Sequence, residues 1–311
     1  MIYPYASTEY SRAFKGLGQV TYIESLGVSA ILRNIPGTDR VDAAALYPMA
    51  WPIHPESATN LRAELAHYNA VSLVLVVDPF CDAIADGWLP DIFDLARPYK
   101  THYMRAPQNN AQPVVPLYSR HHRRNVRLAK SSCTLREVAF SSILNDWHRL
   151  YDVLIARNKL TGIHQFSRSY FEELCDMPGL RTFGAFVGDD LVAASLWFAW
   201  NNHVMLHLAA SSTQGYKCGA AFGNFDLAVQ HFSDRSRINF GGEADLPPSP
   251  NADSAELTGL GRFKSGFANE TRQSWICGLV ADQDAYQSLC ARNDVNTQDF
   301  RYFPAYRGLL L

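Results

Sequence analysis

The chain has 311 residues, twice the ~150 of a typical domain, so its length allows one large domain or two smaller ones. Its composition, with 47% hydrophobic, 12% aromatic and 19% charged residues, excludes a disordered, collagen-like or coiled-coil chain. A formal net charge of −2 excludes a protein that is polybasic throughout.

Neither a membrane segment nor a metal site is expected. The longest apolar runs, 191–200 and 70–77, are about half the ~20 residues of a membrane-spanning helix. The N-terminal residues show no basic segment followed by an apolar one, so we expect a cytoplasmic protein without a secretory signal. No cysteine pair has C-x2-C spacing and no HExxH motif occurs, so we predict no metal site.

The first third alternates between strand and helix patterns. Strands are predicted at 19–23, 28–32, 71–77 and 101–104, and helices near 58–67 and 91–96. This alternation predicts an α/β unit. The following stretch, 106–116, contains Pro107, Pro113 and Pro116 and is the best candidate for a domain boundary, which predicts domains over 1–116 and 117–311.

The sequence pattern after residue 116 predicts a helix, then an antiparallel meander, and then alternating helix and strand. Apolar residues at helical spacing predict a long amphipathic helix around 143–154. Three strand-like runs follow, separated by hairpin signals at 188–190 and 201–202, which predicts an antiparallel meander over 183–187, 191–200 and 204–209. A helix is predicted at 222–232, short strands at 238–240 and 275–280, and a long irregular loop at 244–255, which contains three prolines.

A basic segment lies between these two parts. No acidic residue occurs from Leu95 to Arg136. If 119–130 is helical, one face carries five cations: Arg120, Arg123, Arg124, Arg127 and Lys130. Such a face would hold phosphates of a cofactor, of a nucleotide-linked substrate or of an RNA acceptor stem. The equal alternative is a solvated face whose cations pair with acids elsewhere in the fold.

A glycine-containing segment precedes the helix at 222–232. Glycines there let backbone N–H groups at a helix N-terminus approach an anion. The candidate cofactor-binding residues are Gly215, Tyr216, Lys217, Gly219 and Ala220. A purely structural turn is the alternative interpretation.

Three further residues are candidates for chemistry. Lys264 falls within the apolar arc of a predicted helix formed by Leu257, Leu260, Phe263 and Phe267, so it either extends to the surface or lies in a cleft where its charge meets a developing anion. Glu243 follows a predicted strand end and could be a general base or a solvated loop carboxylate. Cys218, with His207 or His231 as base, could be a nucleophile, although a buried inert cysteine is the commoner case.

Several segments together resemble the FemAB-like acyltransferases of the acyl-CoA N-acyltransferase (GNAT) superfamily. They are YSRHHRRNVRLAK (118–130), INFGG (238–242), GLGRFKSGF (259–267) and YFPAYR (302–307). The order of a meander, a loop and a helix is also that of the GNAT fold. The sequence departs from family patterns at Lys217, where the pyrophosphate loop requires glycine, and at Gly242, where relatives often carry arginine.

The resemblance implies an α/β (α+β) chain of two tandem GNAT-like domains, each a mixed, mostly antiparallel sheet flanked by helices, with a shared cleft. It implies transfer of an acyl or aminoacyl group from acyl-CoA or aminoacyl-tRNA to an amine acceptor, in cell-envelope or exopolysaccharide metabolism. No tightly bound cofactor is expected, and the substrate is a small molecule or a cell-envelope precursor. Lys264 and Glu243 are then the catalytic candidates, and Phe263, Arg123, Arg124 and Arg127 the substrate-binding ones. The alternative function is a non-catalytic GNAT-like scaffold that binds an anionic glycan, peptide or nucleotide conjugate.

Overall fold

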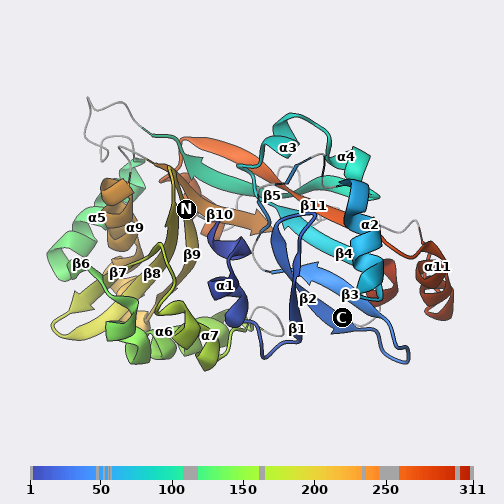
Figure 1. Cartoon of the computed structure of the whole chain (residues 1–311). Coiled ribbons are helices and arrows are strands. Elements are labelled where there is room, and N and C mark those ends of the chain that lie inside the picture. Colours follow the sequence, from blue (N-terminus) through green and yellow to red (C-terminus); the bar gives the residue numbers. More distant parts are fainter. Residues whose placement is uncertain are drawn as a thin grey trace. The chain divides into compact units, whose positions relative to one another are not determined.

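The chain folds into two compact units (Figure 1). The computed structural model describes residues 3–46, 49–51, 53–54, 56, 58–107, 118–160, 165–232, 236–244, 259–297 and 302–308. Unit 1 consists of Thr101–Arg272, and unit 2 of Ile2–Lys100 together with Gln273–Leu311. The predicted boundary at 116 and the predicted loop from 245 onward lie outside the described residues.

Unit 2 is built on a mostly antiparallel sheet. Its strands lie in the order β1 (Gln19–Ile23), β2 (Val28–Asn34), β3 (Val41–Ala45), β4 (Ala70–Val77) and β11 (Glu270–Val280). The pair β3 and β4 is parallel, and the other pairs in this series are antiparallel. The connection between these two parallel strands is a crossover that contains α2 (Ala58–His67), because parallel neighbours cannot be joined by a tight hairpin.

The core of unit 2 is mainly aliphatic. Leu61 and Leu65 of α2 pack against Leu73 and Leu75 of β4 in one buried cluster. The other helices of this unit are η1 (Pro4–Ala6), α1 (Thr8–Arg12), α3 (Asp82–Ala85), α4 (Leu89–Ile92), α11 (Gln283–Arg292) and η6 (Ala305–Arg307).

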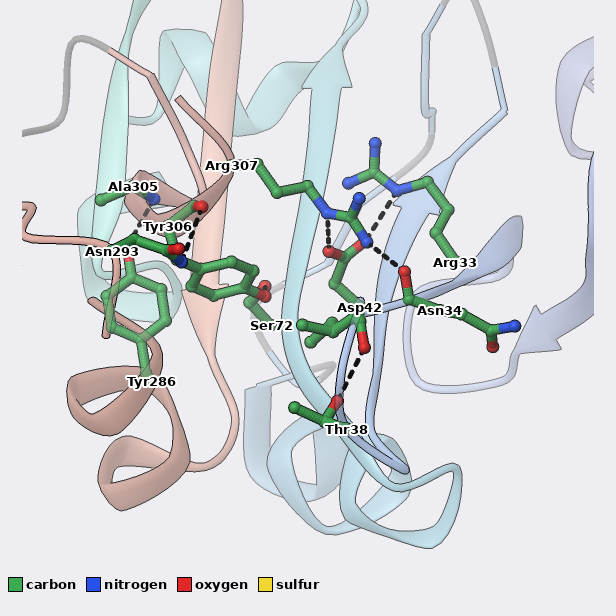
Figure 2. A network of polar contacts seen from close by, with 11 residues as sticks. Arg33, Asn34, Thr38, Asp42, Ser72, Tyr286, Asn293, Ala305, Tyr306 and Arg307 are labelled. Atoms are coloured by element: carbon green, nitrogen blue, oxygen red, sulfur yellow. Dashed lines mark hydrogen bonds and ion pairs between the residues drawn. The ribbon is translucent and has the colours of Figure 1, made fainter. Parts of the chain in front are cut away.

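Polar contacts hold the C-terminal segment onto unit 2 (Figure 2). Tyr306 Oη lies 2.9 Å from Ser72 Oγ of β4, and the backbone N–H of Ala305 donates to Tyr286 Oη at 3.0 Å. Arg307 pairs with the buried Asp42 of β3. The YFPAYR segment therefore has a structural role in this unit.

Unit 1 repeats the same plan. Its strands lie in the order β5 (Leu95–Arg105, of which the residues from Thr101 belong to this unit), β10 (Arg237–Ala244), β9 (His203–Ser211), β8 (Asp190–Trp200), β7 (Leu180–Val187) and β6 (Thr134–Val138). The predicted meander is confirmed, because β7, β8 and β9 pair antiparallel. As in unit 2, the strand after the meander, β10, returns through a helix and pairs parallel to it.

Helices cover the sheet of unit 1. They are α5 (Arg120–Ser132), η4 (Phe140–Ile143), α6 (Leu144–Asn158), α7 (Arg168–Leu174), α8 (Thr213–Lys217), α9 (Ala220–Phe232) and α10 (Gly259–Ser265). The core is rich in aromatic side chains, with Trp197, Phe225 and Phe240 in one cluster. A mixed α/β chain with mostly antiparallel sheet flanked by helices is therefore confirmed.

The helix predicted near 91–96 lies earlier in the chain and is shorter than expected. Only a short turn of helix, α4, precedes Phe93, and β5 begins at Leu95. Pro98 fits the strand that follows, because the residue before it, Arg97, favours extended backbone. Among the described helices, none is long and apolar enough to cross a bilayer.

Candidate functional site

Gly241 shapes the end of β10. Its φ is +86°, and its backbone N–H donates to Asn239 Oδ1 at 2.8 Å. In a regular strand Asn239 and Glu243 would point to one side, opposite Phe240. Tyr103 of β5 packs in one cluster with Phe240, yet its hydroxyl donates to Glu243 Oε2 at 2.9 Å. The positive φ therefore breaks the alternation and turns Glu243 toward the side of Phe240.

Lys264 is a buried lysine on the short helix α10. Its exposed fraction is only 7%. Its Nζ donates to the carbonyl oxygen of Gly242 at 2.9 Å. A Cβ at Gly241 would lie 3.1 Å from the same Nζ, so glycine at 241 leaves room for the ammonium group. The structure excludes a lysine that extends to the surface, and the catalytic role of Lys264 stays a prediction.

Gly261 allows α10 to approach Glu243. A Cβ at Gly261 would lie 1.9 Å from Glu243 Oε2, far inside contact distance. Gly261 and Lys264 are three positions apart and lie on the same side of α10. This side therefore faces residues 241–243, with Glu243 against Gly261 and Lys264 against Gly242. An ammonium, a carboxylate and a phenol hydroxyl come together here from α10, β10 and β5.

Phe263 lies in the aromatic core. Its ring centroid is 4.7 Å from that of Phe225 and 4.8 Å from that of Phe222. Its backbone carbonyl accepts a hydrogen bond from His122 Nε2 at 2.8 Å. Phe263 thus positions α10 in unit 1, and its contact with a substrate stays a prediction.

His122 connects α5 to α10. Burial lowers the pKa of its imidazole. Because Nε2 faces a carbonyl, Nε2 carries the proton and Nδ1 accepts from Ser119 Oγ at 2.9 Å. A Cβ at Gly266 would lie 2.0 Å from the ring, so the glycine permits this packing. The neutral imidazole is therefore a fixed link between the two helices.

The predicted basic helix is confirmed as α5. His122, Val126 and Ala129 form its buried side. Lys130 pairs with the buried carboxylate of Asp226 at 2.7 Å. The remaining predicted cations lie away from the buried side, and three of them are exposed and make no ion pair with any described residue: Arg120, Arg124 and Arg127. Arg123 is half-buried. Phosphate binding by this face stays a prediction.

The predicted cofactor-binding segment forms helix α8 and the turn into α9. The backbone N–H of Gly215 donates to Ser212 Oγ at 3.1 Å, and that of Tyr216 to the carbonyl of Ser212 at 3.0 Å. Gly219 has a φ of +67°, and Ala220 begins α9. Several N–H groups of this segment are thus used within it, and binding of a cofactor by Gly215, Tyr216, Lys217, Gly219 and Ala220 stays a prediction.

Cys218 does not lie beside either histidine suggested as its base. Its Sγ is 3.3 Å from Cys133 Sγ and 3.5 Å from the carbonyl oxygen of Gly215. His207 Nε2 lies 2.7 Å from Tyr170 Oη, and burial lowers the pKa of His207 to about 3. His231 Nδ1 lies 3.8 Å from Glu137 Oε2. The described contacts therefore lack the cysteine-histidine pair that a hydrolase of this type needs.

Tyr103 and His122 were not predicted from the sequence. Tyr103 lies 140 positions from Glu243, and no local pattern connects them. A signal for His122 exists, because Ser119 three positions earlier is a helix-capping residue whose Oγ accepts the His122 N–H.

Three solved structures share the fold of this chain along most of its length. The crystal structure of FemX superposes with a TM-score of 0.65 at 12% identity, covering 90% of this chain and 93% of that one. The chain has the FemX fold. The C-terminal domain of an Agrobacterium fabrum protein named as a lysylphosphatidylglycerol synthetase gives a TM-score of 0.56 at 13% identity, with 92% of this chain and 90% of that one covered. The structure of L-PGS from Bacillus licheniformis gives 0.53 at 11% identity, with 92% and 95% covered.

The FemX fold is recognised from the structure. No protein-family model and no curated protein matches the sequence. At identities of 11–14% these likenesses establish the fold, and the FemAB-like resemblance noted from the sequence is confirmed at that level.

Proposed function

We propose that the protein is an acyltransferase that moves an acyl or aminoacyl group from an activated donor to an amine acceptor. Acyl-CoA and aminoacyl-tRNA are the two donor classes, and a cell-envelope precursor is the acceptor class. The proposal extends the shared plan of the two units to a pair of tandem GNAT-like domains with a shared cleft. The units differ from the predicted domains 1–116 and 117–311, because Gln273–Leu311 belongs to unit 2 together with Ile2–Lys100. The main support of the proposal is the buried ammonium group of Lys264, on the side of α10 that also packs against Glu243 through Gly261, on a FemX fold.

In the proposed reaction the amine nitrogen attacks the acyl carbonyl carbon without a covalent enzyme intermediate. Glu243 accepts the proton that the amine loses, and Lys264 stabilises the developing oxyanion or the leaving group. Such a preorganised donor typically contributes ~3–4 kcal/mol to the transition state. The proton then passes to the leaving thiol or ribose hydroxyl, which completes the transfer.

Donor phosphates are the proposed ligands of the exposed side of α5. Arginine guanidinium groups bind phosphate oxygens in pairs of parallel hydrogen bonds. Arg124 and Arg127 have no acidic partner among the described residues, which fits this role. Phe263, Arg123 and the segment 215–220 are assigned to substrate and donor binding in the same proposal.

The decisive experiment is Lys264→Met in a transfer assay with acetyl-CoA, aminoacyl-tRNA and UDP-linked cell-wall precursors. Methionine keeps much of the packing and removes the charge. We expect at least about a hundredfold loss of turnover with the melting temperature nearly unchanged. The control is Lys159→Met, an exposed lysine at the end of α6. Full turnover by Lys264→Met would remove the assigned role.

A non-catalytic scaffold is the second candidate. It is favoured by the segment 213–220, whose Gly215 and Tyr216 N–H groups are already bonded within the protein. Thermal-shift measurements with the same compounds separate the two candidates, since a ligand at 100 times its dissociation constant stabilises by ~2.7 kcal/mol. Stabilisation without any product would favour the scaffold.

A further inference from the structure

Cys133 and Cys218 are in direct contact in unit 1. Their Sγ atoms are 3.3 Å apart, although the two residues are 85 positions apart in the chain. Both are free thiols and half-buried, whereas Cys81, Cys277 and Cys290 are buried. Two thiols that touch and are partly accessible can be oxidised together, which makes this pair a candidate modification site. The proposed acyl transfer uses neither thiol, and the following argument is independent of it.

The backbone around the two cysteines favours a bond between them. Cys133 follows α5 and leads into β6 with extended backbone, and Cys218 follows α8 just before the turn into α9. The helices α5 and α9 lie side by side (Figure 1). A Cβ at Gly219 would lie 3.1 Å from the backbone oxygen of Asn125, so this turn already packs against α5. Side-chain rotation can therefore bring the sulfur atoms to the ~2.05 Å of a disulfide bond.

The surroundings give the two thiols different roles. The thiol of Cys133 donates to Cys218 Sγ, and burial together with this hydrogen bond raises the pKa of Cys133. Cys218 lies next to the N-terminus of α9, whose partial positive charge favours a thiolate. The weak contact of its Sγ with the carbonyl of Gly215, at 3.5 Å, is given up when the thiol ionises. Cys218 is thus the sulfur that attacks first, and Cys133 is the resolving thiol.

We propose that Cys133 and Cys218 form a reversible disulfide bond by exchange with a low-molecular-weight disulfide such as oxidised glutathione. The Cys218 thiolate attacks one sulfur of oxidised glutathione, which forms a mixed disulfide and releases one glutathione thiolate. Cys133 then loses its proton to solvent and attacks Cys218 Sγ, which releases the second glutathione thiolate. Two protein thiols are oxidised by two electrons, and the glutathione disulfide is reduced to two thiols. The new bond ties the end of α5 to the turn before α9.

Peptide mapping of the full chain, kept in native buffer with excess oxidised glutathione, tests the proposal. After the remaining free thiols are blocked with N-ethylmaleimide, trypsin releases Cys133 in fragment 131–136 and Cys218 in fragment 218–235. We expect a joined fragment whose mass is two hydrogen atoms below the sum of the two. It should form in most chains and should disappear after treatment with dithiothreitol. A joined fragment that is absent, or that forms only after urea is added, would overturn the proposal.

Single variants test the order of attack. Cys133→Ser lacks the resolving thiol, so Cys218 should keep one bound glutathione. Cys218→Ser lacks the attacking thiol, so Cys133 should stay unmodified, and glutathione on Cys133 in this variant would overturn the assigned order. Cys175→Ser is the matched control, because Cys175 is also half-buried in unit 1 but its Sγ lies 3.5 Å from the carbonyl of Phe171. This control should form the joined fragment as the parent does.

Hydrogen exchange measures what the bond does to the turn. A bond to α5 limits opening of residues 218–220, so we expect their amides to exchange at least about threefold more slowly in the oxidised protein than in the reduced one. The amides of α11, in unit 2, should exchange equally in both forms and serve as the internal control. Equal exchange at 218–220 would overturn the inference that the disulfide constrains this turn.

Discussion

Unit 2 and unit 1 both bury polar side chains, but they satisfy them differently. In unit 2, Asp78 accepts hydrogen bonds from Tyr3 Oη at 2.6 Å and from the N–H of Phe80 at 2.8 Å. In unit 1, Arg105 is 1% exposed and its Nε and Nη2 make no hydrogen bond, and the amide of the buried Asn224 makes none. Apart from Arg33, the described part of unit 2 has no comparable group.

This difference in hydrogen bonding indicates that buried polar groups stabilise unit 2, whereas several in unit 1 are unfavourable because they lack a partner. In unit 2, buried carboxylates bind residues from both terminal segments: Asp78 binds Tyr3, and Asp42 binds Arg307. Unit 1 holds most of the buried groups without partners, and it also holds the buried Lys264 and the proposed site. Violations of complete pairing are expected where function requires them. Changes to the acids of unit 2 should therefore alter stability, and changes to the site of unit 1 should alter activity.

The largest stability effect is expected for Asp42→Ala. Removal of the carboxylate, which pairs with both Arg33 and Arg307, leaves them facing each other without a counter-ion. Breaking a buried ion pair in this way lowers the free energy of unfolding by ~3–5 kcal/mol. Urea denaturation measures the loss, and Asp39→Ala, an exposed acid of the same unit, is the control. If the two variants are equally stable, the contacts around Asp42 do not stabilise unit 2.

Asp78 should give unit 2 a pH-dependent stability. Burial raises the pKa of Asp78 to about 6, against the opposing effect of its hydrogen bonds from Tyr3 and Phe80. The folded state thus binds this proton more tightly than the unfolded state, whose Asp pKa is about 3.9. The stabilisation is complete below about pH 4 and is lost as the pH rises through 6, by about 3 kcal/mol in total.

Asp78→Asn should remove this dependence. The amide can accept from the N–H of Phe80 and donate to Tyr3 Oη, as the protonated acid does. The variant and the parent should be equally stable near pH 4, and the variant should be more stable by up to about 3 kcal/mol above pH 7. Urea denaturation at several pH values measures the difference, with Asp39→Asn as control. A difference that does not change with pH would show that Asp78 titrates normally.

Glu243→Gln in unit 1 should lower turnover and leave stability nearly unchanged, unlike the unit 2 variants, which change stability. Loss of a general base reduces turnover by about a hundredfold or more, which corresponds to about 2.7 kcal/mol. The free energy of unfolding should change little, because glutamine can still accept from Tyr103 Oη. The transfer assay and urea denaturation measure the two quantities. A large loss of stability with unchanged turnover would show that Glu243 stabilises the fold and is not a general base.

Local patterns predicted most elements of this fold correctly. The hairpin signals predicted β7, β8 and β9, and the apolar arc around Lys264 identified a lysine that the structure shows to be buried. The edge strand β6 was missed because Arg136 and Glu137 interrupt its apolar pattern, as is common at sheet edges. The helix α11 could have been found from its capping residue Asp282.

Contacts between distant segments could not be predicted. β11 follows unit 1 in the chain but pairs with β4, about 200 positions earlier. The pattern of a strand shows which of its faces is buried but does not name the strand that it pairs with. For the same reason the partner of Glu243, Tyr103 on β5, was not identified. The sequence shows that positions 241 and 261 are glycines. Only the structure shows that Gly241 leaves space for the ammonium group of Lys264 and Gly261 for the carboxylate of Glu243.

The smallest expected effect concerns the exposed side of α5. If Arg124 and Arg127 hold donor phosphates, Arg124→Gln/Arg127→Gln should raise the Michaelis constant for the donor about five- to tenfold at low ionic strength and leave the rate at saturation unchanged. The reason is that such contacts are equal in the ground state and the transition state. Because the Debye length falls from ~10 Å at 0.1 M salt to ~3 Å at 1 M, the effect should shrink as salt is added.

The control for this last prediction removes the same number of charges elsewhere in unit 1. Arg149 and Arg168 are exposed and pair with Asp146 and Asp152. Exposed pairs of this kind contribute ~0–1 kcal/mol to stability, so Arg149→Gln/Arg168→Gln should leave the Michaelis constant unchanged at both ionic strengths. If both double variants behave alike, the cations of α5 act only through the net charge of the protein. A rise confined to the α5 variant would tie this helix to the donor and extend the functional role of unit 1 beyond Lys264 and Glu243.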